Sequence, residues 1–153
     1  MEISVQKDDL SDGSIINLLE LHLQEMHKHS PPGSVHALDR EGLVDPAVSF
    51  WSAKINGILA GCGALKEITP TLGEIKSMKT DFIFLRKGVA RALLERIITE
   101  AKLRQYQQIK LETGSSDPFA PAVALYRQYG FQSCGPFSNY KEDPYSLFFC
   151  KQL

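Results

Sequence analysis

An amphipathic helix that begins directly after a glycine constrains this chain more than any other feature of its sequence. From residue 89 onward, apolar residues recur every three or four positions, which is the period of one face of an α-helix. The stripe consists of Val89, Leu93, Ile97 and Ala101, widened by Ala90, Leu94 and Ile98. A polar, strand-like segment at 74–80 precedes Gly88. The chain is therefore organised around a strand, a glycine and a helix.

The start of this helix has the properties of an anion site. The first turn of a helix leaves backbone N–H groups without intrahelical partners, and they carry the positive end of the helix dipole. Gly88 and Ala90 leave little side chain between these groups and a ligand, while positive charge is added by Arg86, Lys87 and Arg91. We therefore predict that these residues, together with the backbone of Val89, bind a pyrophosphate group.

Two familiar phosphate motifs, G-x-x-x-x-G-K-[ST] and G-x-G-x-x-G, do not occur in the sequence. The stretch instead resembles the acetyl-CoA loop of the GNAT family of N-acetyltransferases, written [QR]-x-x-G-x-[GA]. Gly88 and Ala90 match the last two fixed positions of that motif. Leu85 stands where the family usually has Gln or Arg, and Arg86 lies next to it as a replacement.

A second motif strengthens the resemblance. The run from Ala122 to Phe131 reads A-x-x-L-Y-x-x-x-G-F, which is similar to motif B of the same family, with Tyr126 as its tyrosine. Phe119 stands where the family often has an asparagine that contacts the pantetheine arm. The resemblance covers roughly residues 48–152.

The resemblance implies one N-acetyltransferase domain over residues 1–153, with a mixed α/β fold. We expect a mostly antiparallel sheet of about six or seven strands, with one parallel, splayed pair, flanked by about four helices. The expected strands are 2–6, 48–55, 58–66, 74–80, 109–113, 131–134 and 146–151, and the expected helices are 15–28, 35–43, 89–101 and 121–129.

The clearest local signal is a hairpin. Asn56-Gly57 lies between two apolar runs, which is typical of a type I′ turn. Gly61 and Gly63 interrupt the second strand and indicate a bulge or a close neighbour.

Composition excludes several functional classes. The net charge of −1 argues against a general nucleic-acid binder, and no apolar run is long enough to span a membrane. The N-terminus lacks the regions of a signal peptide. The three cysteines show no C-x-x-C spacing, and the histidines at 22, 27 and 29 do not form H-E-x-x-H, so we expect no metal. We expect a reducing cytoplasm as the location. The sequence does not determine the oligomeric state, and a homodimer is possible.

The family chemistry assigns roles to individual residues. Backbone groups of Met78 and Thr80 would bind the pantetheine arm as an added strand would, and the Met78 amide is a plausible donor to the thioester oxygen. Glu74 is the first choice for the general base. Glu112 is the weaker alternative for the base and could instead orient the acceptor. Tyr126 would protonate the departing thiolate, although it also suits a helix face packed on a sheet.

The acceptor is not defined by these residues. His29 and His36 lie in the region that would line its pocket, and we take both, with Glu112, as candidates for substrate contact. We expect acetyl-CoA as the cosubstrate and the primary amine of a small molecule, amino acid or peptide as the acceptor. Three alternatives remain: a hydroxyl acceptor, a different acyl group, and a CoA-binding sensor or partner-binding module that has lost transfer.

Overall fold

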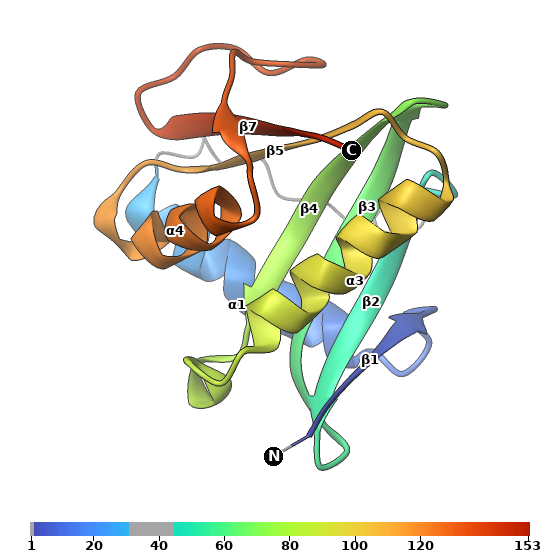
Figure 1. Ribbon diagram of the computed structural model, residues 1–153. Helices are drawn as coiled ribbons and strands as arrows, with labels where there is room; N and C mark the ends of the chain where they lie inside the picture. The colour runs from blue at the N-terminus through green and yellow to red at the C-terminus, as the bar shows by residue number, and fades with distance from the viewer. Residues whose placement is uncertain (1, 31–44) are drawn as a thin grey trace.

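The computed structural model describes residues 2–30 and 45–153, which form a seven-stranded sheet with helices on both faces (Figure 1). The strand order is β1-β2-β3-β4-β5-β7-β6; only β4 and β5 are parallel neighbours. The strands are β1 (Ile3–Asp8), β2 (Val48–Ile55), β3 (Ile58–Thr69), β4 (Leu72–Thr80), β5 (Gln108–Gly114), β6 (Gln132–Ser133) and β7 (Ser146–Gln152). The helices are α1 (Ser14–His29), α3 (Val89–Leu103) and α4 (Ala120–Gln128), with short 3-10 turns η2 (Phe82–Phe84) and η3 (Asp117–Phe119).

The fold class and the order of these elements confirm the sequence-based expectation. The expected helix at 35–43 lies outside the described residues. The sixth strand is shorter than predicted, because only Gln132–Ser133 of the expected 131–134 pairs with β7. Within the described part of the chain, no helix combines the length and the apolar character needed to cross a membrane.

The β2–β3 hairpin forms where the sequence predicts it. Asn56 and Gly57 both have positive φ, 52° and 79°, as a type I′ turn requires, and Ile55 pairs with Ile58 across it. The positive φ values match the right-handed twist of the two strands. This hairpin fixes the register of the part of the sheet on which α3 packs.

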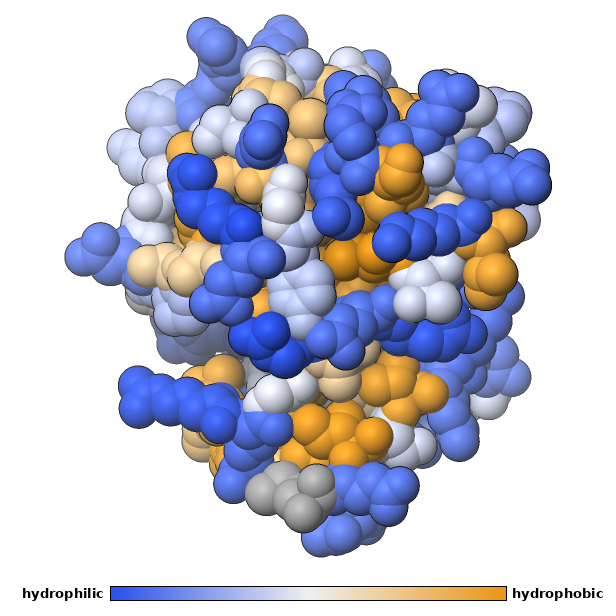
Figure 2. Space-filling model, viewed as in Figure 1, coloured by the Kyte–Doolittle hydropathy of each residue, from blue (hydrophilic) through white to orange (hydrophobic). Residues whose placement is uncertain are grey.

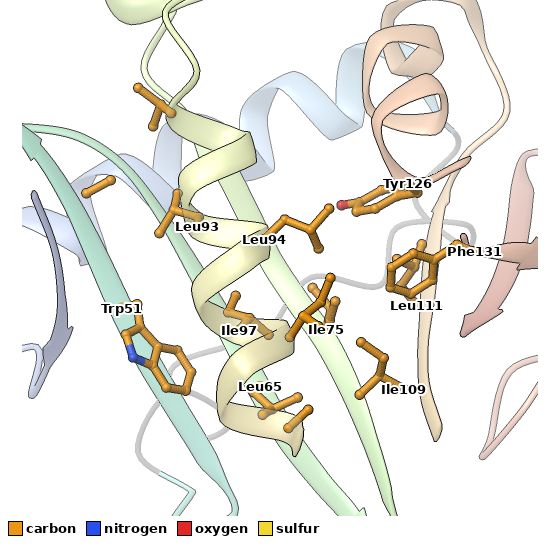
Figure 3. Close-up of a cluster of buried hydrophobic side chains, with 14 of the residues drawn as sticks. Trp51, Leu65, Ile75, Leu93, Leu94, Ile97, Ile109, Leu111, Tyr126 and Phe131 are labelled. Atoms are coloured by element: carbon orange, nitrogen blue, oxygen red, sulfur yellow. The ribbon is translucent and has the colours of Figure 1, made fainter. Parts of the chain in front are cut away.

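Helix α3 buries its apolar stripe against one face of the sheet. Leu93, Leu94 and Ile97 are fully buried and pack with Trp51 of β2 and Leu65 of β3 (Figure 3). The outward side of the helix carries polar residues, so the face in Figure 2 shows hydrophilic side chains between apolar areas. Burial of the stripe holds the first turn of α3 in a fixed place.

Helix α1 covers the opposite face of the sheet (Figure 1). Its Ile15 and Leu18 pack with Phe50 of β2 and with Cys62 and Ala64 of β3. Cys62 is therefore a packing residue, as its apolar surroundings in the sequence suggest. Burial raises the pKa of its thiol to about 12, which keeps the thiol protonated and unreactive.

The glycines of β3 let α3 approach the sheet closely. A Cβ atom at Gly61 would lie 2.7 Å from Val89 Cγ1 and 2.7 Å from the Lys79 carbonyl oxygen. A Cβ atom at Gly63 would lie 2.5 Å from Met78 Sδ and 2.9 Å from Ile97 Cδ1. The β3–β4 register also shifts between Cys62 and Ala64, so both readings of these glycines, a bulge and a close neighbour, are confirmed.

Replacement of Gly61 by alanine should therefore destabilise the protein. The added methyl group meets a backbone carbonyl that cannot swing aside, and overpacking of this kind costs roughly 1–3 kcal/mol of the free energy of unfolding. Chemical denaturation of Gly61→Ala measures the loss. Gly135→Ala is the control, because a Cβ atom there meets nothing within 4 Å. Equal stability of the two variants would contradict the close approach.

Candidate active site

The parallel strands β4 and β5 separate part-way along their length. Their pairing ends at Ile75 and Leu111, although β4 continues to Thr80 and β5 to Gly114. Ser77 of β4 has a φ of 56°, a left-handed conformation that breaks the regular strand just beyond the last pair. Within the described residues, the β5-facing edge of β4 beyond Ile75 therefore has no strand partner. The predicted splayed pair is confirmed.

Met78 and Thr80, the predicted pantetheine-binding residues, lie on this unpaired part of β4. The Met78 side chain packs against the core that α3 covers, so its thioether lies on a face of the sheet and not at the unpaired strand edge. A free strand edge offers backbone donors and acceptors to an extended ligand. Binding of the pantetheine arm by these two residues stays a prediction.

The loop that leads into α3 has the backbone geometry expected of an anion cradle, while binding of a pyrophosphate there stays a prediction. Gly88 is the N-cap of α3 with a φ of 88°, and no side chain caps the helix there. The first-turn amides of Val89, Ala90 and Arg91 are therefore left for a ligand. Arg86 also has a positive φ, 64°, and its side chain and that of Lys87 are exposed to solvent. A left-handed turn followed by free amides makes a concave anion site.

The Arg91 side chain does not point into this loop. Its guanidinium donates to Gln128 Oε1 at 2.8 Å and to the Tyr129 hydroxyl at 3.1 Å, at the end of α4. The Tyr129 hydroxyl in turn donates to Glu95 of α3. These contacts bind the first turns of α3 to the last turn of α4. Its side chain is therefore engaged away from the loop, and binding of a pyrophosphate by either the amide or the side chain of Arg91 stays a prediction.

Tyr126 lies on the buried side of α4. It is 6% exposed, and Figure 3 shows its hydroxyl directed toward Leu94 of α3. The helix ends in a Schellman motif, in which the Gly130 amide donates to the Arg127 carbonyl and the Phe131 amide to the Tyr126 carbonyl. That turn brings the Phe131 ring edge-on to Tyr126, with centroids 5.6 Å apart. The G-F of the sequence motif therefore fixes the tyrosine ring.

The Tyr126 hydroxyl keeps its proton. No described residue forms a hydrogen bond with it. Burial raises the pKa of Tyr126 above its ordinary value, and the negative charge of Glu112 raises it further. A neutral phenol in this position is able to donate a proton.

Glu112 is the first residue of β5 beyond its pairing with β4. Its neighbour Leu111 points into the core, so Glu112 lies on the other face of the strand. Burial raises the pKa of Glu112 from 4.5 to about 7, and the nearby charges of Glu74 and Asp143 add to the rise. Lys76 and the Ser146 hydroxyl act in the opposite direction. A carboxylate that titrates near neutrality is suited to accept a proton.

Glu74, the first choice for the base, lies in a different setting. It is 3% exposed, and its Oε2 accepts from the Tyr140 hydroxyl at 2.5 Å and from Lys76 Nζ at 3.3 Å. Lys76 Nζ also donates to the Tyr140 hydroxyl at 2.9 Å. Glu74 is thus held in a closed network of three side chains, while its role as base stays a prediction.

Tyr140 and Lys76 are site residues that sequence reasoning missed. Tyr140 lies 66 positions after Glu74, and no spacing rule connects them. A signal was present, because the polar segment 135–145 contains three aromatic residues, Phe137, Tyr140 and Tyr145. Aromatic residues in an otherwise polar loop indicate that part of it is packed.

The histidine predictions cannot be placed. His29 is the last residue of α1, with its side chain outside the description, and His36 lies outside the described residues altogether. Among the described residues, no group of His, Cys, Asp and Glu could hold a metal ion. A cavity of about 720 Å³ lies elsewhere, between Lys7–Leu10 and Asp45–Phe50, and none of the predicted site residues lines it.

The described residues can therefore do two kinds of work. The strand gap and the cradle suit an extended ligand that carries an anionic group. Beside the gap, Glu112 can take a proton and Tyr126 can supply one, as transfer of an acyl group from a thioester to an amine requires.

Comparison with known proteins points to one family. The sequence profile of the acetyltransferase (GNAT) family matches residues 15–131. The uncharacterized N-acetyltransferase YsnE of Bacillus subtilis is 50% identical over 97% of this chain and 99% of its own length. IAA acetyltransferase of Azospirillum brasilense is 34% identical over 99% of this chain and 98% of its own.

A solved structure agrees on the fold. A GNAT family acetyltransferase from Elizabethkingia anophelis with acetyl-CoA bound superposes with a TM-score of 0.72. The superposition covers 99% of this chain and 98% of that one, at 22% sequence identity.

The ionisation of Glu112 predicts a pH-dependent stability difference. Glu112 loses its proton near pH 4.5 in the unfolded chain and near pH 7 in the folded protein. The stability that protonated Glu112 contributes to the folded state is therefore present at low pH and is lost as the pH rises through this range. The variant Glu112→Gln cannot ionise at this position, so it should lose less stability than the wild type as the pH rises. Its unfolding free energy relative to that of the wild type should therefore be higher by roughly 1–3 kcal/mol at about pH 8 than at about pH 4.5. Denaturant titrations at both pH values, with the exposed Glu142→Gln as control, measure the difference; a constant difference would refute the raised pKa.

Proposed function

The chain belongs to the acetyltransferase (GNAT) family, and on that premise we propose that it transfers an acetyl group from acetyl-CoA to the primary amine of a small molecule, amino acid or peptide. One arrangement supports the proposal: Glu112, whose pKa is raised by burial to about 7, lies where β4 and β5 separate, and the buried phenol Tyr126 lies near it. This pair has the two proton-transfer functions that the reaction needs.

The residues present fit acetyl-CoA. The uncapped first turn of α3, with Gly88 in a left-handed conformation and Arg86 and Lys87 exposed beside it, suits the pyrophosphate. The unpaired edge of β4 at Met78 and Thr80 suits the pantetheine arm. Bound acetyl-CoA would supply the acetyl group as an activated thioester. Acetyl-CoA bound to a family member of the same fold supports this assignment.

Glu112 is the base in this proposal, which reverses the ranking made from the sequence. An acceptor amine is protonated at neutral pH and must lose a proton before it can attack a carbonyl carbon. The Glu112 carboxylate, with a pKa raised to about 7, can remove that proton directly or through a water. Glu74 remains the alternative base, although its Oε2 is already occupied by Tyr140 and Lys76.

Tyr126 is the acid. As the new C–N bond forms and the C–S bond breaks, the departing sulfur gains negative charge, and Tyr126 holds a proton at Oη to neutralise it. The lack of a hydrogen-bond partner among the described residues leaves this proton available. The residue is buried among apolar side chains, which limits the water that can compete for the proton.

The acceptor is proposed only by class. His29 and His36 remain candidates for contact with it, and the relative named IAA acetyltransferase makes IAA one compound to include in a screen. Transfer of another acyl group, transfer to a hydroxyl, and a CoA sensor without turnover remain alternatives that the same screen separates. We also propose a cytoplasmic location, since acetyl-CoA has to be available.

The test is a screen of amines, with IAA added, in which acetyl-CoA is supplied and free thiol release is read. We expect the wild type to turn over at least one amine and to be stabilised against heat by acetyl-CoA. Gly88→Val should lose both effects, because its side chain fills the cradle. Gly13→Val is the matched control, since Gly13 is the N-cap of α1 with a similar φ, 77°, and bears the same backbone strain away from the site. Retained binding in Gly88→Val would move the anion site elsewhere.

Tyr126→Phe isolates the acid. The substitution keeps the ring and its contact with Phe131. Acetyl-CoA affinity and stability should therefore change little, while kcat falls by about 10²–10⁴. Steady-state kinetics on the acceptor found in the screen measure the loss. If kcat stays within about threefold, well below the usual contribution of an acid, the hydroxyl is not the proton donor.

A further inference from the structure

The network of Glu74, Lys76 and Tyr140 lies at the branch point of the two parallel strands. The last residues to pair are Ile75 and Leu111, so Lys76 and Glu112 are the first residues beyond the pairing on each strand. Both follow a residue that packs in the core, which turns both side chains to the opposite face of the sheet. Lys76 and its partners therefore stand beside Glu112.

We propose that Lys76 and Tyr140 are positioning residues that hold Glu74 in a neutral ion pair beside Glu112, and so fix the pH range in which Glu112 accepts a proton. The inference rests on the proposed role of Glu112 in acetyl transfer. It gives Glu74 a function that does not require it to touch the acceptor.

Aromatic packing fixes Tyr140 relative to Glu112. Phe148 of β7 is the direct cross-strand partner of Glu112. The Tyr140 ring packs on Phe148 with centroids 5.7 Å apart and on Phe137 at 5.0 Å, while Phe137 and Phe148 are 6.0 Å apart. Phe137 and Phe148 are buried. The loop is thus anchored on the residue opposite Glu112, which directs the Tyr140 hydroxyl to Glu74.

The hydrogen bonds of the network hold opposite charges together. The Lys76 and Glu74 side chains are only 12% and 4% exposed, so neither charge is screened well by water. The Tyr140 hydroxyl accepts from Lys76 and donates to Glu74, which closes the triangle. A buried charge is costly without its partner, so each member keeps the other two in place.

Glu112 experiences several other groups besides this pair. Of the described residues, Asp143 acts on it from the loop before β7 and Ser146 from β7, and Lys110 lies two residues before it on the same face of β5. Tyr126 of α4 packs with Leu111 on the opposite face of the sheet, and the charge of Glu112 still raises its pKa. Tyr126 is neutral, and Asp143 and Lys110 are left unchanged by the variants below. Lys76 and Glu74 are therefore the two charges whose removal has opposite consequences.

The signs follow from electrostatics. Loss of the Lys76 cation leaves Glu74 as an uncompensated negative charge, which disfavours ionisation of Glu112. Loss of the Glu74 charge leaves the Lys76 cation uncompensated, which favours ionisation of Glu112. A charge at this range moves a titration midpoint by about one pH unit. Loss of both charges should largely cancel.

The experiment is a carbon NMR titration of the glutamate carboxyl groups in the protein without substrate, with the Glu112 signal assigned through Glu112→Gln. We expect Lys76→Met to raise the Glu112 midpoint and Glu74→Gln to lower it, each by about one pH unit, and the double variant to lie within about 0.3 of the wild type. Lys76→Gln is the second variant if Lys76→Met does not fold. Shifts in the same direction, or no shift in either variant, would overturn the proposal.

Tyr140→Phe tests the positioning itself. Without the Tyr140 hydroxyl, the Lys76–Glu74 ion pair is free to move away from Glu112. The shifts of the Glu112 midpoint that Lys76→Met and Glu74→Gln cause should therefore shrink by at least about half in the Tyr140→Phe background. Tyr145→Phe makes the same chemical change at an exposed position in the same loop and should leave them at full size. Full-size shifts in Tyr140→Phe would show that Tyr140 positions nothing.

The titration needs no acceptor, so it separates the two claims. If the shifts appear as expected but no acceptor is acetylated, the electrostatic inference stands and the proposed transfer fails. If an acceptor is acetylated, the acid limb of its kcat/KM profile should move with the NMR midpoint in each variant. A limb that stays fixed while the midpoint moves would remove Glu112 as the base.

Discussion

The separation of β4 from β5 is the constraint on which the rest of the site depends. Hydrogen bonds tie the two strands together as far as Ile75 and Leu111, and the left-handed Ser77 then turns the end of β4 away. A continuous ladder would satisfy every backbone group and leave no room for a ligand. The interruption leaves unpaired edges that a ligand can complete, and it brings Glu112 to the start of the gap.

Glu74, which is buried, and Glu112, which is partly buried, lie on one face of the sheet and differ because of their neighbours. Glu74 has a cation and a hydroxyl within hydrogen-bond distance, whereas burial dominates at Glu112 and works against its charge. Neither residue type nor strand position separates them. The choice between the two carboxylates depends on what the loop before β7 places beside each one.

The sequence was sufficient for the features that depend on local chemistry. The Asn56-Gly57 turn and the apolar stripe of α3 were both predicted, because each follows from backbone preference or helical period. Gly61 was also interpreted correctly, because a glycine inside an apolar strand indicates a bulge or a close neighbour, and the structure has both. The parallel pairing of β4 and β5 was expected from the family resemblance and from the strand–helix–strand path of the chain.

What the sequence could not supply was contact between distant segments. Tyr140 reaches Glu74 only after the sheet has formed, and the pKa of Glu112 depends on burial that no spacing encodes. The direction of the Arg91 side chain is of the same kind. A cation at a helix start suggests an anion, yet here it binds the neighbouring helix.

The Arg91 contacts have a thermodynamic consequence for ligand binding. The guanidinium can turn to an incoming phosphate only by releasing Gln128 and Tyr129, so part of the attraction is spent on breaking bonds already made. Those same bonds join the helix that begins at the cradle to the helix that carries Tyr126. An anion that draws Arg91 away would leave only the Tyr129–Glu95 hydrogen bond of these contacts between the two helices, whereas an anion bound by backbone amides alone leaves all of them in place. The position of one side chain would thus link an anion at the start of α3 to the packing of the helix that carries Tyr126.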